Sequence, residues 1–165
     1  MPTPEFVATL RAHVGHDPLW LSTAAGVVLD SDNKVLLGRR SDTGGWALPG
    51  GIIDPAEEPA DAAAREVFEE TGVLAVPERL IAVSVSSRMR YPNGDRVQYL
   101  ELTLLCRPVG GRAQVNDSES VEVGWHPLST LPQLSQHTLS LLAHATSGKA
   151  EAAFVFSGID RLLGE

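Results

Sequence analysis

Hydrophobic residues follow a helical period at the start of the chain and a strand period after it. Over residues 4–14 they recur at helical intervals, which predicts a short amphipathic helix that ends near Gly15. Two apolar runs, 24–29 and 34–37, then flank the polar residues 30–33. This arrangement predicts a β-hairpin with a four-residue turn.

A glycine-rich loop and a second helix follow the predicted hairpin. Residues 44–51 contain four glycines and one proline, so we expect a loop with at most a short strand. From Pro59 the composition changes to strong helix formers, which continue to Thr71. Gly72 suits the left-handed position that ends many helices. The sequence therefore predicts a helix over residues 59–71.

Strands and a last helix are predicted for the second half of the chain. A turn at 91–95 separates the first two strands, and Ser135 is a candidate N-cap for a helix over residues 135–145. We therefore expect one domain with a mixed or antiparallel sheet flanked by helices. The strands are predicted at residues 79–87, 97–107 and 121–125.

Composition narrows the class of protein. The 165 residues suit one globular domain, and their formal net charge is −8 at pH 7. Binding to long nucleic acid or to anionic membranes needs clustered Lys and Arg, so we expect neither as a partner. No apolar run approaches the roughly 18 residues of a membrane span, and the first residues lack a signal-peptide pattern, so we expect a cytoplasmic protein. Cys106 alone forms no internal disulfide, and its apolar surroundings predict burial.

Most of the negative charge lies in one segment, residues 51–73. The segment holds seven acidic residues and one basic residue, which places −6 of the −8 there. Glu66, Glu69 and Glu70 stand at i, i+3 and i+4 of the predicted helix, so their carboxylates share one face and repel one another. Oxygen ligands of this kind suit Mg²⁺ first and Mn²⁺ second. A solvated acidic face paired with Arg65 is the alternative that the helix alone leaves open.

The spacing of these residues resembles a known catalytic motif. From Gly51, five residues lead to Glu57, and seven more lead to the run Arg-Glu-Val-Phe-Glu-Glu-Thr-Gly-Val at 65–73. This run matches the Nudix box, G-x5-E-x7-R-E-U-x-E-E-x-G-U, in which U is a bulky aliphatic residue. Seven fixed identities make a chance match about 10⁻⁶ or rarer. The chain therefore resembles the Nudix hydrolases, and the compatible pattern covers residues 24–131.

The resemblance implies a fold and a metal-dependent reaction. The implied fold is an α/β/α sandwich around a mixed β-sheet, in which the box forms a loop-helix-loop. In this family a divalent metal, normally Mg²⁺, lets water attack a phosphorus of a nucleoside diphosphate linked to another group. By position, the implied metal ligands are Glu66, Glu69, Glu70 and the backbone carbonyl of Gly50, with Glu119 as an extra ligand.

Other catalytic roles also follow from the resemblance. Glu57 and Arg65 are expected to form a supporting ion pair, which would tie the loop to the helix and orient the carboxylates. The general base varies in this family, and Glu69 and Glu119 are the two candidates. We prefer Glu119, in the polar loop before the last strand. Glu122 is a weaker candidate, because strand alternation fits a solvent-facing residue.

Substrate-binding residues are expected outside the box. Arg39 and Arg40 end the second predicted strand, and alternation sends them to opposite faces, so at most one faces a substrate phosphate. Arg88 and Tyr91 lie around the 91–95 turn, where they either hold phosphate and base or form a solvated hairpin end. Trp46 either lines the pocket or packs beside the loop.

The sequence thus predicts a Mg²⁺-dependent pyrophosphohydrolase of a nucleoside diphosphate derivative or a nucleoside triphosphate. The substrate stays open because Tyr91 and Pro92 lie 18 and 19 residues beyond Val73. Relatives selective for dinucleoside polyphosphates often carry a Tyr near that distance, and ADP-ribose hydrolases often carry a Pro slightly closer. A nucleotide-sensing module without hydrolysis is the alternative, although such modules usually lose box carboxylates.

Three segments are expected along the chain. They are a helical extension at 1–17, the catalytic domain at 18–147 and a tail at 148–165. The apolar stripe of the first helix must be buried against the core or a second subunit, so a homodimer is one expected partner state.

Overall fold

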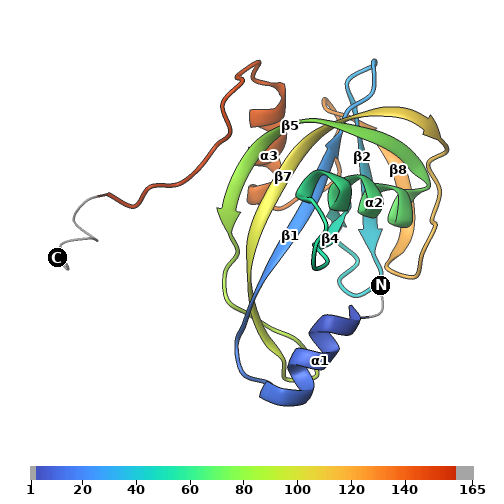
Figure 1. The fold of residues 1–165 in the computed structure, drawn as a ribbon. Helices are drawn as coiled ribbons and strands as arrows, with labels where there is room; N and C mark the ends of the chain where they lie inside the picture. The colour runs from blue at the N-terminus through green and yellow to red at the C-terminus, as the bar shows by residue number, and fades with distance from the viewer. Residues whose placement is uncertain (1–2, 159–165) are drawn as a thin grey trace.

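Two β-sheets carry the fold, and the computed structural model describes residues 3–158 (Figure 1). The larger sheet has the strand order β4-β1-β7-β5, with β6 pairing to β7, and the smaller sheet has the order β3-β2-β8. In the larger sheet the strands are β4 (Gly50–Ile52), β1 (Leu19–Val28), β7 (Arg96–Gly111), β5 (Val73–Val85) and β6 (Met89–Arg90). In the smaller sheet they are β3 (Trp46–Ala47), β2 (Lys34–Arg40) and β8 (Ser120–Pro127).

Three helices cover these sheets within the described part of the chain. They are α1 (Glu5–Val14), α2 (Pro59–Thr71) and α3 (Gln136–Thr146). β1 and β7 run parallel, whereas the other pairs in the larger sheet are antiparallel. The predicted mixed sheet with flanking helices is therefore confirmed. No helix in residues 3–158 has the length and apolar character needed to cross a bilayer.

The predicted hairpin of β1 and β2 is wrong beyond its turn. The turn itself forms, because the Asp30 carboxylate accepts the N–H groups of Asp32 and Lys34 at 2.9 and 2.8 Å. After the turn, only the isolated bridge between Leu29 and Val35 joins the two segments. β1 pairs along its whole length with β7, and β2 pairs with β8 in the other sheet. Each strand thus pairs with a strand distant in sequence, and the predicted local pairing of β1 with β2 does not form.

Other elements differ from prediction mainly in length. α2 has its predicted bounds, and α3 begins after Ser135, whose Oγ accepts the N–H of Thr138 at 3.0 Å as the predicted N-cap. β5 begins at Val73, six residues earlier than predicted, because β7 offers it a partner as far as Gly111. The glycine-rich loop contains two short strands, β3 and β4, where at most one was predicted.

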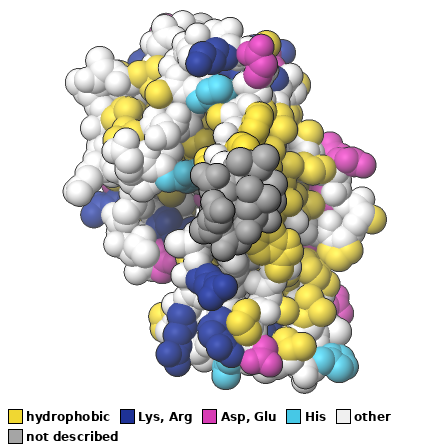
Figure 2. All heavy atoms as spheres, turned by 90° about the vertical axis from the view of Figure 1, so that its left-hand side faces the viewer, with side chains coloured by type: hydrophobic (Ala, Val, Ile, Leu, Met, Phe, Trp, Pro, Cys, Tyr) yellow, Lys and Arg dark blue, Asp and Glu magenta, His cyan; other side chains and the backbone are white. Residues whose placement is uncertain are grey.

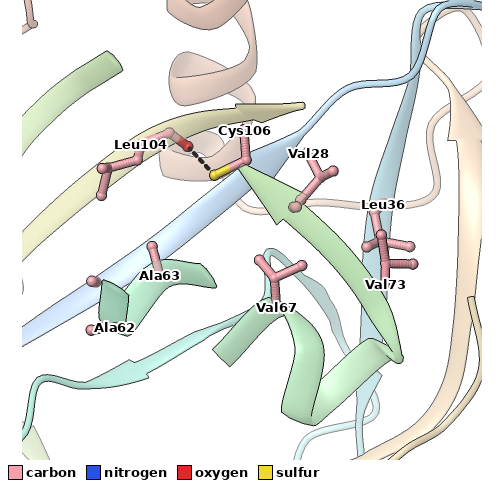
Figure 3. Close-up of a cluster of buried hydrophobic side chains, with 10 residues drawn as sticks. Val28, Leu36, Ala62, Ala63, Val67, Val73, Leu104 and Cys106 are labelled. Carbon is pink, nitrogen blue, oxygen red and sulfur yellow. Dashed lines mark hydrogen bonds between the residues drawn. The ribbon is translucent and has the colours of Figure 1, made fainter. Parts of the chain in front are cut away.

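Hydrophobic clusters bind the helices to the sheets. α2 packs through Ala62, Ala63 and Val67 against a cluster that includes Leu36 and Cys106 (Figure 3). Cys106 is buried there, as predicted. The other main cluster joins α3 to β1, β2 and β5. Its fully buried members include Val27, Val35, Leu37 and Ile81.

α1 packs against its own chain at the far end of the larger sheet. Val7 is buried with Leu21 and Val97, and Phe6 packs against the same cluster. Arg11 donates to the carbonyl oxygen of Arg96 at 2.8 Å, which fastens the helix to β7. The predicted apolar stripe is therefore buried against the core only at its start, because Leu10 and Val14 are exposed. The division of the chain into three segments stays a prediction.

The C-terminal segment crosses the edge of the larger sheet and then leaves it. Ala153 forms a parallel bridge to Ala82 of β5, and the following side chains, residues 154–156, are exposed. Figure 2 shows hydrophobic side chains gathered over this side of the molecule. The remainder of the predicted tail, 159–165, lies outside the described residues.

Candidate active site

α2 presents the acidic residues of the box. The helix begins with Pro59, which is well tolerated at the first helical position, and ends at Gly72, whose φ of 70° is left-handed. On its surface Glu66 is fully buried and Glu70 is 8% exposed, whereas the side chain of Glu69 is 42% exposed. The predicted shared face therefore exists, and the sheets cover two of its three carboxylates.

Two consecutive glycines allow β4 to approach these carboxylates. The N–H of Gly50 donates to Glu70 Oε1 at 2.9 Å. A Cβ atom at position 51 would lie 2.6 Å from Cδ of Glu66, closer than such atoms approach, so Gly51 leaves the space that the Glu66 carboxylate occupies. Gly51 is thus needed for the Glu66 carboxylate to reach the loop, whereas a Cβ atom at position 50 would collide with Ala24 and Ala25 of β1.

Arg65 forms the predicted ion pair with Glu57 and reaches further. Its guanidinium donates to both oxygens of Glu57 at 2.8 Å, and to the carbonyl oxygen of Ile52 at 3.2 Å. Its NH1 group also donates to Glu66 at 2.7 Å and to Glu69 at 3.2 Å. The hydrogen bond from Arg65 lowers the pKa of Glu57. The guanidinium therefore ties the loop to the helix.

Burial dominates the electrostatics of Glu66 and Glu70. It raises the pKa of each to about 7, although Arg65 opposes the shift at Glu66 and the Gly50 N–H opposes it at Glu70. Within residues 3–158, Glu66 Oε2 is buried without a hydrogen-bond partner. Two buried carboxylates with one unsatisfied oxygen fit a bound cation, which would relieve both the repulsion and the missing contact.

The donor set is also chemically suited to a hard divalent ion. Carboxylate and carbonyl oxygens are the ligands that Mg²⁺ and Mn²⁺ prefer. In the described part of the chain, no three His, Cys, Asp or Glu side chains are already placed as the ligands of one ion. Arg65 instead bonds to both Glu66 and Glu69. Glu69 would exchange its contact with Arg65 for one with the metal.

The two predicted arginines go to different partners, and the pairing of β2 with β8 is irregular between them. Arg39 donates to the carbonyl oxygen of Gly44 at 3.1 Å and lies 3.6 Å from Glu122. Arg40 donates twice to Asp42, at 2.9 and 2.7 Å. The pKa of Arg40 is raised, first by its hydrogen bond to Asp42 and also by the charges of Glu70 and Tyr91. Arg40 is therefore the arginine nearer the buried carboxylates.

The two aromatic candidates, Tyr91 and Trp46, also lie in different surroundings. The Tyr91 hydroxyl lies 3.0 Å from that of Tyr99 on β7, and burial raises the pKa of Tyr99. Trp46 packs edge-to-face on His126 at 4.5 Å between ring centroids, so the packing alternative describes it. Arg88 is exposed between β5 and β6. The structure thus places Tyr91 near Arg40, and Trp46 in a hydrophobic cluster.

The loop before β8 contains an acidic residue that the sequence did not single out. The charge of Asp117 contributes to the raised pKa of Glu70, so the two carboxylates are close. Asp117 Oδ1 also accepts the N–H of Glu119 at 2.9 Å. Glu119 is half-buried, and its carbonyl oxygen accepts the N–H of Ser41 at 2.7 Å. The sequence does contain a signal for Asp117, because an Asp two residues before Glu119 has the spacing at which its side chain typically accepts a backbone N–H in a turn.

Comparison with known proteins matches residues 20–144 to the NUDIX domain. A MutT-like protein of Streptomyces ambofaciens is 39% identical over 108 residues, which cover 66% of this chain and 64% of that protein. The 8-oxo-dGDP phosphatase NUDT18 of Mus musculus is 32% identical over 135 residues, 78% of this chain and 37% of that protein. Another relative is named ADP-ribose pyrophosphatase. The chain thus spans less than two-thirds of the length of the first two relatives.

Solved structures show the same fold. A NUDIX hydrolase from Nitrosomonas europaea has a TM-score of 0.65 at 23% identity, over 85% of this chain and 99% of that chain. The predicted α/β/α architecture is confirmed, with α2 on one side of the sheets and α3 on the other. The chain belongs to the Nudix hydrolase family, and the box at residues 51–73 is complete.

Proposed function

We propose that the chain is a Mg²⁺-dependent pyrophosphohydrolase that cleaves the diphosphate linkage of a nucleoside diphosphate derivative or a nucleoside triphosphate. The observation that carries this proposal is the buried carboxylate pair of Glu66 and Glu70 beside the Gly50-Gly51 strand. The names of two relatives, 8-oxo-dGDP phosphatase and ADP-ribose pyrophosphatase, support a nucleotide anhydride as substrate. Mn²⁺ is the expected substitute ion.

Carboxylates of α2 and groups of two loops would hold the ion. When bound, the ion neutralises charge on the phosphate oxygens and activates the attacking water. Arg65 and Glu57 keep the loop and helix in the arrangement that orients these ligands. The proposed ligands are Glu66, Glu69, Glu70, the Gly50 carbonyl oxygen and Glu119.

A carboxylate must also accept a proton from the attacking water. We propose Glu119 for this role, with Glu69 as the alternative. The backbone of Glu119 is held by Asp117 on one side and by Ser41, at the end of β2, on the other. Because Asp117 is close to Glu70, this loop stays beside the buried carboxylates.

Substrate phosphates need a cation beside these carboxylates. Arg40 meets this requirement, because it lies close enough to Glu70 for their charges to interact, and Tyr91 is near it. We propose Arg40 and Tyr91 as substrate contacts. Arg39, Trp46 and Arg88 stay weaker predictions of the sequence, as does the cytoplasmic location.

The proposal is tested by a substrate screen. The full chain is incubated with 8-oxo-dGDP, ADP-ribose, UDP-sugars, dinucleoside polyphosphates and nucleoside triphosphates, with Mg²⁺, with Mn²⁺ and with excess chelator. We expect metal-dependent turnover of at least one compound, with a nucleoside monophosphate or diphosphate among the products. Nucleotide binding without turnover of any compound would instead indicate a nucleotide-sensing module. Full turnover in chelator would contradict the proposed chemistry.

A further inference from the structure

A row of polar side chains crosses the middle of the larger sheet. Strand register places Thr23 of β1 beside Glu101 of β7, and Glu101 beside Ser84 of β5. Neighbours in register project from the same face of a sheet. Ser84 Oγ donates to Glu101 Oε2 at 3.0 Å, and Nε2 of His137, in the first turn of α3, lies 3.6 Å from the same oxygen. One carboxylate is thus held by groups from two elements.

The polar row interrupts an otherwise apolar face. On this face of β1, Leu21 packs in the cluster beneath α1, and Val27 packs in the cluster beneath α3. Figure 1 shows these two helices at opposite ends of the larger sheet. The Glu101 side chain, between them, is 29% exposed. Ser84 and His137 both contact Oε2 and so meet only part of the hydrogen-bonding capacity of this half-buried carboxylate, and the remaining capacity points to a ligand.

The polar row lies on the α3 side of the larger sheet, and the edge strand β4 lies between it and the carboxylates of α2. β4 is two strands from β7, which places its backbone about 10 Å from Glu101 at the usual strand spacing. Gly50 of that strand donates to Glu70. The charge of Arg40 acts both on Glu70 and on Tyr99, which precedes Glu101 by two residues and shares its face of β7. Arg40 therefore links the carboxylates to the face that carries the polar row.

We propose that Glu101 recognises the nucleoside part of the substrate by accepting hydrogen bonds from two adjacent donors. This inference rests on the proposed function and specifies its substrate. An ionised carboxylate only accepts hydrogen bonds, and its two oxygens have about four lone-pair sites. Ser84 and His137 engage Oε2, so the two lone-pair sites of Oε1 can accept from two donors of a ligand. Ser84 is then a positioning residue.

Two parts of a nucleotide supply adjacent donors. Guanine presents its N1–H and its 2-amino group side by side, and a ribose presents its 2′- and 3′-hydroxyl groups. Adenine and cytosine each place one amino donor beside a ring-nitrogen acceptor, which a carboxylate would repel. Either guanine among the bases or the ribose hydroxyl pair therefore satisfies Glu101 best.

The test compares substrates that differ by one donor. With Mg²⁺ present, kcat and KM are measured for guanosine, inosine, adenosine and 2′-deoxyguanosine nucleotides. Inosine lacks only the 2-amino group of guanosine. Recognition of the base predicts at least a tenfold preference in kcat/KM for guanosine over inosine, and recognition of the ribose predicts it for guanosine over 2′-deoxyguanosine. Calorimetric binding of GMP and IMP gives a second readout that needs no turnover.

Variants then assign the preference to one carboxylate. Glu101→Gln should abolish the substrate preference in kcat/KM, because the amide replaces an acceptor with a donor. The effect should appear in KM, with kcat changed less than about threefold. Ser84→Ala should weaken it partly. Glu78→Gln is the matched control, because this exposed β5 residue pairs with Arg107 and should leave every ratio unchanged.

Separate outcomes test the inference and the function on which it rests. Unchanged preferences in Glu101→Gln, with a melting temperature that falls as in His137→Asn, would show that Glu101 only docks α3 and would overturn the inference. A wild-type protein that turns over none of these nucleotides or those of the wider screen would overturn the proposed function. In that case, discrimination between GMP and IMP by calorimetry still supports or contradicts the role of Glu101.

Discussion

Glu66 and Glu70 combine burial with acidity, and this combination makes stability depend on pH. Burial raises the pKa of each to about 7 in the folded protein, above the usual value near 4.5. Protons bind these groups more tightly in the folded than in the unfolded chain. The stabilisation that these two groups give the metal-free protein is therefore complete below about pH 4.5. It is lost as the pH rises through about 7.

The melting temperature of the metal-free protein should fall between about pH 5.5 and pH 8, and millimolar Mg²⁺ should raise it more at the higher pH, by about 3 °C or more. Mg²⁺ competes with protons for the same oxygens, so bound Mg²⁺ stabilises the protein most at a pH where the carboxylates are ionised. Differential scanning calorimetry in matched buffers measures both effects. An equal Mg²⁺ effect at the two pH values would contradict binding at Glu66 and Glu70.

A comparison of two substitutions separates metal ligands from their support. Glu70→Gln should abolish most turnover, whereas Glu57→Gln should lower kcat by about 10- to 100-fold, because Glu57 reaches the ligands only through Arg65. Initial rates across a Mg²⁺ titration measure both effects. Equal losses with unchanged metal affinity would mean that the two roles are wrongly assigned.

The general base is tested by removing each candidate. Glu119→Gln should lower kcat by about 100-fold with little change in KM, and the acidic limb of the pH profile should flatten. If Glu69 is the base instead, raised Mg²⁺ should partly rescue Glu119→Gln but not Glu69→Gln. Less than a threefold effect of Glu119→Gln at subsaturating Mg²⁺ would exclude both roles for Glu119.

Among the elements, those determined by local interactions match prediction and those determined by distant pairing do not. α2 has its predicted bounds because Pro59 and Gly72 mark its ends. The β1–β2 hairpin was wrong because its turn is local, whereas β1 finds a parallel partner in β7 more than 70 residues away. A sequence pattern predicts that an apolar run forms a strand, but not which strand pairs with it.

α1 links the N-terminal segment to the box. Residues 3–6 line a cavity of about 660 Å³ together with Asp54, Arg65 and Glu69. Val7 fills the cluster with Leu21 and Val97. The helix therefore supports one wall of the space beside the exposed carboxylate of α2.

Deleting residues 1–17 should lower the melting temperature by about 5 °C or more, because the cluster beneath α1 becomes exposed to water. It should also lower kcat/KM, because the cavity beside Glu69 loses a wall. Scanning calorimetry and initial rates measure these effects, and light scattering measures the mass. If the intact chain has the mass of a dimer and the deletion lowers it to that of a monomer, the homodimer expected from the sequence gains support. An unchanged melting temperature would contradict the packing of α1.

In the molecule as a whole, the sequence predicts the chemical centre better than its surroundings. The box carboxylates and the Glu57–Arg65 pair follow from a local motif, and the structure brings them together. Asp117 and Glu101 were missed because their importance depends on contacts with distant elements. Sequence alternation separated Arg39 from Arg40, but only the fold places Arg40 beside Glu70.

Metal-dependent attack of water on phosphorus is tested directly by turnover of a nucleotide substrate in water enriched in ¹⁸O, with Mg²⁺ and with chelator. We expect that turnover requires the metal and that mass spectrometry finds one ¹⁸O atom in a phosphate group of a product, because water attacks phosphorus. The same reaction with Glu70→Gln should give almost no labelled product. Turnover in chelator, or ¹⁸O in a carbon-bound hydroxyl group and in no phosphate group, would contradict metal-dependent attack at phosphorus.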